Sequence, residues 1–450
     1  MRLSIIITIF FFYVFEHLWS NEPYNQAQYS ELSAHDIIDY KFNGFLMPYL
    51  NNNHSQSDSI FNLIVYHAIQ ISNFKPEINT SFIMSGVDGY FSFFIEPIIT
   101  NAIYGKKNLG TTYSRNNMSM RFKNAFIKYE KNNIKVVFGR THLWWGQSNR
   151  SSIIQNYSYP NFDKLAFKYK KGKYFYEAFV GQLNSKYNNE NYRIRRNIGG
   201  HRLVWRPLKN MLFGIGEKII YTGRNRGIEL IYLNPFIPYI FTSLEKNEES
   251  FPYDNDNSMI FGDFRYLLRK NLSLYGELII DDFQIDDTNV DNATGIKLGL
   301  DGKFNDRLIY IFEYTKINPW TYLHHGQFTS WEQNYHPLGF KYGPNVECLH
   351  FKTIFEINNY DIIFDFNLLE KGRNNIFSEW NNSLSENKLY LKNYVIYNFA
   401  VIRNFQTLRT EFGWKSKSFN LDPTVEYFYK NVKINGTYYL KMYFEFNKDL

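Results

Sequence analysis

The sequence predicts an all-β fold, namely a transmembrane antiparallel β-barrel of roughly 18 strands with a short N-terminal periplasmic element. Three observations support this prediction. Apolar and polar residues alternate along much of the chain, short turns alternate with long loops, and the N-terminus resembles that of an exported protein. Aromatic residues make up 19% of the 450 residues, which suits strands better than helices.

The first residues are typical of a secretory signal peptide, which we assign to residues 1–20. Arg2 supplies a short positive region, residues 3–15 are apolar, and a polar stretch ending at Ser20 follows. The apolar run is shorter than the about 20 residues that a membrane-spanning helix needs. Cys348 is the only cysteine, which excludes a lipid anchor at the cleavage site and a disulfide framework.

The rest of the chain divides into two parts. In residues 21–60 apolar and polar residues alternate less clearly, and these residues form the expected periplasmic element. The stretch YSELSAHDIIDY suits a short amphipathic helix, and a plug is the other alternative for this element. Residues 61–450 form the expected barrel with long extracellular loops. The most apolar internal run, residues 228–241, contains Pro235 and Pro238, so it predicts a constrained loop or a loop-borne hairpin and not a spanning helix.

Alternation with a period of two is clearest in the second half of the barrel. In residues 272–281, leucine and isoleucine alternate with Ser273, Tyr275 and Glu277, which gives one apolar and one polar face. The same pattern recurs at residues 260–269, 307–314, 361–368 and 438–446. Assigning strands one by one gives an odd number. A barrel whose first and last strands both start or end in the periplasm needs an even number. We therefore expect one wrong assignment, within residues 389–431.

The connections alternate in length. Short turns are expected at residues 132–133, 171–172, 207–210, 270–271 and 358–359. Long loops are expected at residues 141–163, 183–198, 222–257, 315–346 and 369–388. Short turns at one end and long loops at the other are typical of outer-membrane barrels. A soluble β-sandwich, the alternative, does not usually keep so regular a rhythm.

No motif predicts catalysis or metal binding. His324, His325 and His336 lie close together, but the adjacent pair points to opposite faces of an extended chain and no metal-binding spacing is present. The stretch GQSNR lacks the final glycine of a nucleophile elbow. The carboxylates of residues 253–258 are more typical of turns than of a calcium loop. We therefore expect no enzyme activity, no cofactor and no metal.

Five motifs carry a family resemblance. They are FGRTHLWWGQ (138–147), GEKIIY (216–221), YLNPFIPY (232–239), DNDNS (254–258) and PLGFKYGPN (337–345). In this order they resemble the Wzi capsule-assembly family of outer-membrane proteins. The resemblance implies a closed outer-membrane β-barrel with a periplasmic N-terminal element, whose members act as surface lectins that hold capsular or other exported polysaccharide on the cell.

The expected function is therefore that of a lectin-like protein in the bacterial outer membrane that binds and retains capsular or exported polysaccharide. We expect a monomer surrounded by outer-membrane lipids. The formal net charge of +7 suits an anionic partner, and the sequence has no block of like charges that would predict nucleic-acid binding. A porin or substrate-specific channel is the alternative, which an open charged lumen would favour. A barrel-borne hydrolase is a third possibility, which would need a nucleophile, a base and oxyanion donors in one pocket.

The candidate glycan site draws on aromatic and polar residues of the long loops. Aromatic faces stack on sugar rings while amides and imidazoles bond their hydroxyls, although tryptophan at this height also suits the membrane-interface girdle. The predicted outward-facing site comprises Trp144, Trp145, Gln147, Tyr232, Asn234, Trp320, His324 and Trp331. The residues expected to shape its loops are Gly139, Arg140, Gly146, Pro235, Pro337, Gly339, Gly343 and Pro344.

Overall fold

The computed structural model describes most of the chain beyond the N-terminal element. The described residues are 60–72, 75–101, 103–104, 107–108, 118–148, 151–156, 161–234, 237–242, 255–282, 292–304, 307–324, 328–334, 336–357, 360–378, 392–404, 408–416, 419–421 and 436–449. The predicted signal peptide and residues 21–59 of the predicted periplasmic element lie outside them. The first described strand begins at Ile60, next to the predicted start of the barrel.

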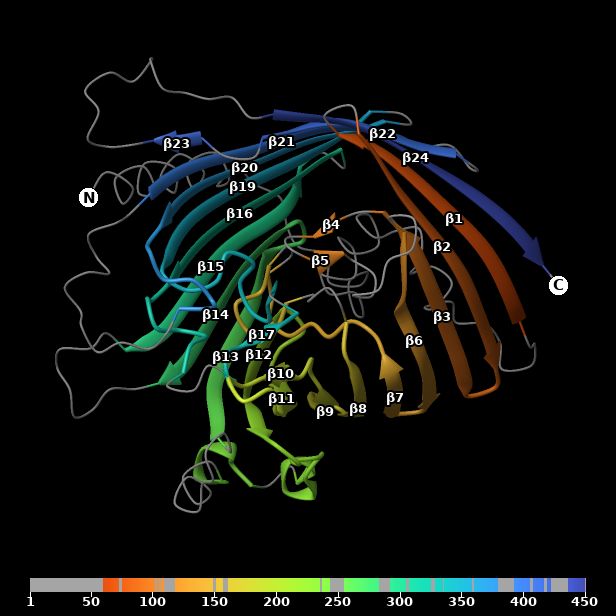
Figure 1. The fold of residues 1–450 in the computed structure, drawn as a ribbon. Helices are drawn as coiled ribbons and strands as arrows, with labels where there is room; N and C mark the ends of the chain where they lie inside the picture. The colour runs from red at the N-terminus through yellow and green to blue at the C-terminus, as the bar shows by residue number, and fades with distance from the viewer. Residues whose placement is uncertain are drawn as a thin grey trace.

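The described strands form a closed antiparallel ring (Figure 1). Its first nine are β1 (Ile60–Ser72), β2 (Lys75–Asp88), β3 (Phe91–Thr100), β6 (Ser119–Lys131), β7 (Ile134–Arg140), β8 (Asp163–Lys171), β9 (Tyr174–Gln182), β11 (Arg193–Trp205) and β12 (Met211–Gly223). The ring continues through β13 (Asn255–Arg269), β14 (Leu272–Asp282), β15 (Ala293–Phe304), β16 (Leu308–Ile317), β19 (Val346–Ile357), β20 (Tyr360–Lys371), β21 (Lys392–Asn404), β22 (Leu408–Ser416) and β24 (Gly436–Asp449). Because β24 pairs with β1 as well as with β22, the sheet closes on itself.

The all-β barrel prediction is confirmed, and so is its size. The large sheet has 20 described strands, of which β10 (Lys186–Tyr187) and β23 (Phe419–Leu421) are short additions, and the other eighteen make the ring. The extra strand β23, which pairs with part of β21, lies in the segment where one wrong assignment was expected. Two small hairpins complete the described strands: β4 (Ile103–Tyr104) with β5 (Lys107–Asn108), and β17 (Glu332–Gln333) with β18 (His336–Pro337).

The predicted connections that the structure describes match it with one correction, and the turn expected at residues 358–359 lies outside the described residues. The turns at residues 132–133 and 270–271 are tight hairpin turns, and the long loops follow β7, β9, β12, β16 and β20. The loop expected at residues 183–198 ends at residue 192, because β11 begins at Arg193. The polar residues at 193–198 therefore belong to a strand, and the Arg196 guanidinium bonds acidic and carbonyl partners inside the barrel.

The strands bury their polar face and expose their apolar face. On β14, Ser273, Tyr275 and Glu277 are buried, whereas Leu278 on the opposite face is 45% exposed. A soluble sandwich would bury the apolar face instead. The alternation therefore belongs to a barrel with a polar lumen and an apolar outer wall.

The run at residues 228–241 is a loop, as expected. It contains a short 3-10 helix, η1 (Leu230–Leu233), and a single helical turn at residues 239–242, so the hairpin alternative does not occur in its described residues. Across the described ranges, no helix is long and apolar enough to cross a membrane. In Figure 1 this yellow-green segment beyond β11 and β12 lies outside the ring.

Candidate functional site

Two long loops fold into the barrel and pack against each other. We call them the lumen insert, defined as residues 145–156 after β7 and residues 318–345 after β16, within their described parts. Trp145 and Gln155 pair as a β-bridge and close the first loop. The Tyr322 hydroxyl donates to the Ile153 carbonyl at 2.6 Å and so joins the two loops. Burial raises the pKa of this hydroxyl well above its ordinary value, so it remains a donor.

The carboxylate of Glu277, on the lumen face of β14, anchors the first loop. It accepts backbone N–H groups from Gln147 and Ser148, both at 2.6 Å, and from Ile153 at 2.8 Å. The Ser152 hydroxyl adds a fourth contact at 2.9 Å. A loop can bury its backbone inside a barrel only if its N–H groups have hydrogen-bond acceptors. One carboxylate supplies two acceptor oxygens.

Gly146 makes this close approach possible. Its backbone has a φ of 118°, which side chains rarely adopt. A Cβ at this position would also collide with the Ser152 hydroxyl and the Glu277 carboxylate. Of the residues expected to shape the loops, Gly146 therefore has a specific structural role beside the anchoring carboxylate.

A second carboxylate on β14 anchors the other loop. Asp281 accepts the backbone N–H of Tyr322 and the indole N–H of Trp331, both at 2.7 Å. Trp331 is 0% exposed, and the Lys218 ammonium lies over its ring. The same ammonium donates to the Ile154 carbonyl, so Lys218 contacts both loops of the insert.

Arg196, on β11, holds the tip of the second loop. Its fully buried guanidinium donates to the carbonyls of Phe328 at 2.6 Å and Ser330 at 2.7 Å. It also pairs with the buried carboxylate of Glu332 at 2.8 Å, and Lys186 approaches the same carboxylate at 3.0 Å. Breaking such a buried pair leaves an uncompensated charge, so the tip is firmly fixed.

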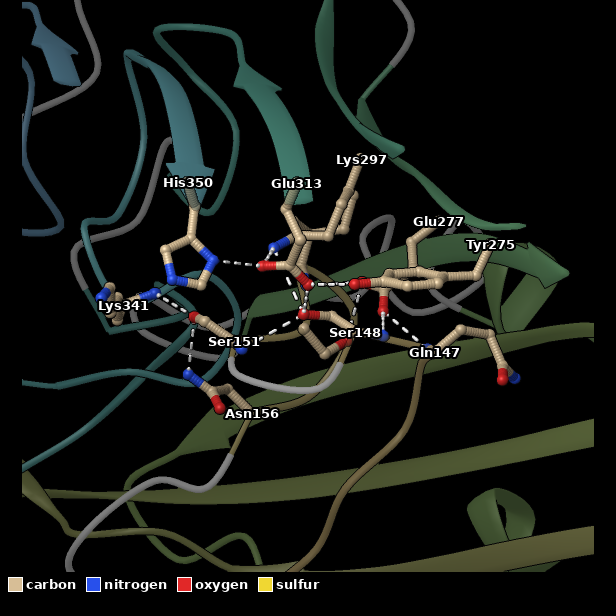
Figure 2. A network of polar contacts seen from close by, with 12 residues as sticks. Gln147, Ser148, Ser151, Asn156, Tyr275, Glu277, Lys297, Glu313, Lys341 and His350 are labelled. Carbon is tan, nitrogen blue, oxygen red and sulfur yellow. Dashed lines mark hydrogen bonds and ion pairs between the residues drawn. The ribbon is translucent and has the colours of Figure 1, made fainter. Parts of the chain in front are cut away.

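Glu313, on β16, is the centre of a third group of contacts (Figure 2). Its carboxylate accepts the hydroxyls of Ser148 at 2.5 Å and Tyr275 at 2.8 Å. Lys297 lies 3.2 Å away and His350 lies 3.3 Å away. Because all these groups are buried, the network fills the lumen beside the insert with polar atoms that satisfy one another.

Two arginine pairs complete the wall contacts near Gln147. Arg265 pairs with Asp301 at 3.0 Å and donates to the Gln147 carbonyl at 2.6 Å. Arg202 pairs with Asp263 at 2.6 Å, and the Gln147 side-chain amide donates to the same carboxylate. These four charged groups of the wall therefore contact the insert and one another.

An apolar cluster lies between the two loops and the wall. Trp145 packs its ring against Phe179 and Phe261, with centroids 5.0 and 5.5 Å away. The other insert residues of this cluster are Ile153, Ile154, Trp320, Tyr322, Leu323, Trp331, Leu338 and Phe340. The insert thus has its own hydrophobic core inside the barrel.

A third long loop folds in the opposite direction, onto the outer wall. We call residues 224–242 the outer flap, within their described parts. Tyr232 and Tyr239 pack against Val180, Ile219 and Tyr221 in a second buried cluster. The adjacent strand residue Lys218 reaches the insert inside the barrel, and because neighbouring strand residues face opposite sides, Ile219 faces outward.

Two carboxylates on the outer wall hold the flap. Asp256 pairs with Arg226 and accepts the Tyr232 hydroxyl at 2.5 Å. Glu217 accepts the backbone N–H of Tyr239 at 2.8 Å and contacts His201 at 3.0 Å. Burial, with the neighbouring Asp256 carboxylate, raises the pKa of the Tyr232 hydroxyl far above its ordinary value, so it remains a donor.

The eight predicted glycan residues fall into three places. Trp145, Gln147, Trp320 and Trp331 are buried in the lumen insert, and Tyr232 is buried between the flap and the outer wall. Asn234 is exposed on the flap, whereas Trp144 and His324 are half-buried. As folded here, the five buried side chains offer no free face to a sugar, so the outward-facing glycan site remains a prediction for the other three.

The loop-shaping residues also have definite places where they are described. Gly139 and Gly343 adopt positive φ angles of 123° and 72°. Arg140 pairs with Asp163 at 2.7 Å, and a Cβ at Gly339 would meet the Tyr322 ring. Pro337 lies in β18, Pro344 is buried, and its carbonyl accepts the Lys371 ammonium. Pro235 lies outside the described residues.

The anchoring residues were missed at the sequence level. Glu277, Asp281 and Glu313 stand on the polar faces of predicted strands, and that position was their only signal. Of the neighbouring histidines, whose spacing predicts no metal site, His324 contacts the Thr329 hydroxyl at 3.2 Å, and His325 lies outside the described residues. Over the residues that the structure describes, no group of three or more His, Cys, Asp or Glu side chains could hold a metal ion.

A closed antiparallel barrel with polar groups on its inner face, an apolar outer wall and two loops packed inside it defines the class: an outer-membrane-type β-barrel. Its family is shown by sequence comparison. The family model described as capsule assembly protein Wzi matches residues 71–347, which is more than half of the chain, and the chain belongs to this family.

Solved structures share the fold. The Escherichia coli Wzi structure, described as an outer-membrane protein involved in group 1 capsule assembly and a carbohydrate-binding β-barrel, is 13% identical, with a TM-score of 0.60. That match covers 93% of this chain and 90% of Wzi. OccD3 (OpdP) of Pseudomonas aeruginosa is 7% identical with a TM-score of 0.51, over 87% of this chain and 92% of its own. Among curated protein sequences, none matches this chain.

Proposed function

We propose that this protein is an outer-membrane β-barrel that binds capsular or exported polysaccharide and retains it on the cell surface, without catalysing a reaction. Membership of the capsule assembly protein Wzi family supports the proposal. So does the carbohydrate binding ascribed to the E. coli relative. The apolar outer wall suits a lipid bilayer, and we propose a monomer because the ring closes within one chain.

The packing of two long loops inside the barrel is the observation that carries the proposal. The insert satisfies Glu277, Asp281 and Arg196, which would otherwise be available to line a pore. A barrel whose wall charges bond its own loops is better suited to present a surface than to pass solutes. This arrangement supports a polysaccharide-binding scaffold over a diffusion channel.

The same contacts support the absence of catalysis. The hydroxyls of Ser148 and Ser152 in the anchored loop donate to the carboxylates of Glu313 and Glu277. The backbone N–H groups of Gln147 and Ser148, which could serve as oxyanion donors, are bonded to Glu277. The arrangement therefore has donors and acceptors that are already paired with each other.

The test is polysaccharide retention on cells. A strain lacking the protein should shed polysaccharide that the parent retains, and re-expression should restore retention at matched barrel levels. Trp144→Ala with His324→Ala should reduce retention, whereas Trp205→Ala, at the short-turn end, should not. Because one aromatic stack binds a sugar weakly, the effect arises from many repeats and many copies. Equal retention with and without the protein would contradict the proposal.

A further inference from the structure

We infer that the outer wall carries a site for one glycerophospholipid, with an acyl chain in the cavity beneath the outer flap and the phosphate at the basic short turns. The inference rests on the proposed outer-membrane location. The cavity has a volume of about 620 Å³, within the range of small-molecule sites. Pro238 and Ile240 of the flap bound it on one side, and β8, β9, β11, β12 and β13 bound it on the other.

The cavity lies on the lipid side of the barrel. Leu203 and Ile215, which line it, are 45% and 63% exposed. Arg202, next to Leu203, faces the lumen, where it pairs with Asp263. Because neighbouring strand residues face opposite sides, Leu203 faces outward, toward the acyl chains of a bilayer.

The depth of the cavity along the barrel wall places it in the membrane leaflet nearest the short turns. Tyr174, Trp205 and Phe213 are exposed near those turns, and the Trp205 and Phe213 rings lie 6.2 Å apart. Such aromatic residues mark the membrane interface of a barrel. Leu203 is two residues from Trp205, so the cavity begins about 7 Å inside that interface. Tyr232 and Tyr239 cover the wall on the long-loop side, so a chain would enter from the short-turn side.

Charge on the adjoining turns fits a phosphate group. Lys171, Lys173 and Lys209 are exposed in the β8–β9 and β11–β12 turns, which contain no acidic residue. The Lys173 ammonium donates to the Pro207 carbonyl at 2.8 Å and so holds the two turns together. Lysine ammonium groups bind phosphate as point charges, and here they lie just beyond the aromatic interface.

A polar group inside the cavity favours a ligand that carries a hydrogen-bond acceptor over a plain hydrocarbon. Tyr176 lines the cavity, and its hydroxyl is buried with no hydrogen-bond partner in the described chain. A buried hydroxyl without a partner is unfavourable, because it has lost its hydrogen bonds to water and gained none in return. Tyr176 lies two residues from the interfacial Tyr174, the level at which a phospholipid carries its ester carbonyls. An ester carbonyl there would accept the hydroxyl.

The experiment measures lipid binding by the purified, delipidated full-length barrel with native mass spectrometry. The probe is dioleoyl phosphatidylglycerol, and purified lipid A is the comparison. The parent should bind one phosphatidylglycerol in preference to lipid A. Leu203→Trp, which fills the cavity, and Lys171→Glu with Lys173→Glu should each weaken binding about tenfold. The matched control is Leu298→Trp on β15, which is exposed on the outer wall away from the cavity.

Three results would overturn the inference. Equal binding by Leu203→Trp, Leu298→Trp and the parent would mean an unspecific lipid shell. Preference for lipid A would assign the site to the other leaflet. A dimer that Leu203→Trp disrupts would mean that a second copy covers this face. Heat-modifiable gel mobility confirms that each variant is folded. Retention in the same strains tests the proposed function separately, because Leu203, Lys171 and Lys173 are not among the predicted glycan residues.

Discussion

The lumen insert and the outer flap are both built from loops rich in aromatic residues, but they are held on opposite sides of the same barrel wall. Neighbouring residues of β12 make the contrast clear: Lys218 contacts the insert inside, and Glu217 holds the flap outside. On β13, Asp263 contacts the insert through Gln147, whereas Asp256 holds the flap through Tyr232. The face on which a strand places a charged residue therefore decides where a loop docks.

The lumen insert and the outer flap also differ in how they are anchored. Glu277 and Asp281 hold the insert mainly through backbone N–H groups, so the chain itself is fixed. The flap is held mainly by side chains, with Arg226 and Tyr232 on Asp256. We therefore expect the insert to be more stable than the flap, and each can be released without the other.

The largest effect is expected from Glu277→Ala. It leaves the N–H groups of Gln147, Ser148 and Ile153 buried without an acceptor, at a cost of about 1–3 kcal/mol each. Hydrogen exchange across residues 145–156 should become faster by at least tenfold, while the flap stays protected. The control, Glu217→Ala, should do the reverse. Unchanged protection of the insert in Glu277→Ala would contradict its anchoring role.

Trp331→Ala should destabilise the whole barrel by about 3–5 kcal/mol, because it removes a fully buried indole. The readout is the temperature at which the folded gel band converts to the unfolded one. Trp205→Ala is the matched control, since this tryptophan is exposed on the outer wall. If both variants melt at the same temperature, Trp331 is not part of a packed core.

Asp256→Ala should release the flap and leave the insert in place. The change removes the partner of Arg226 and Tyr232, at a cost of about 2 kcal/mol. Limited proteolysis of intact cells should cut within residues 224–242 in this variant and not in the parent. Asp263→Ala, on the lumen face of the same strand, should leave the flap resistant. A resistant flap in Asp256→Ala would place its anchor elsewhere.

The smallest effect is a pH dependence of the flap. The pKa of Tyr232 is raised by burial and by Asp256, so the folded flap keeps the phenol protonated while the released flap can ionise it. The stabilisation is fully present below the ordinary tyrosine pKa of about 10 and decreases as pH rises above it. Protease resistance should therefore fall above about pH 10 in the parent. In Tyr232→Phe this component should be absent, and an identical profile in both would exclude Tyr232 as its source.

Strand order and turn positions could be predicted from the sequence because they depend on local patterns. The alternation at residues 272–281 and the turn at residues 270–271 need only neighbouring residues. The number of strands, roughly 18, could be predicted from the length of the chain, and the ring has eighteen, although assigning strands one by one gave an odd number. The family could be predicted too, since its motifs stand in order along the chain.

The docking of the loops could not be predicted in the same way. Trp145 and Trp331 stand in aromatic, polar segments that suit a sugar-binding surface. Whether they face a sugar or a core depends on Glu277 and Asp281, and the contact from Gln147 to Glu277 spans 130 positions. No local pattern records a pairing at that distance. Asn234, in contrast, stands on an exposed part of the flap, as the predicted site requires.

We propose that the lumen insert closes the barrel to solutes. Planar-bilayer recordings of the purified parent protein test it most directly, with Glu277→Ala as the variant in which the insert is released. The parent should show little steady conductance, and the variant should show frequent openings. Large, stable openings in the parent would contradict the account and would move the protein to the porin class.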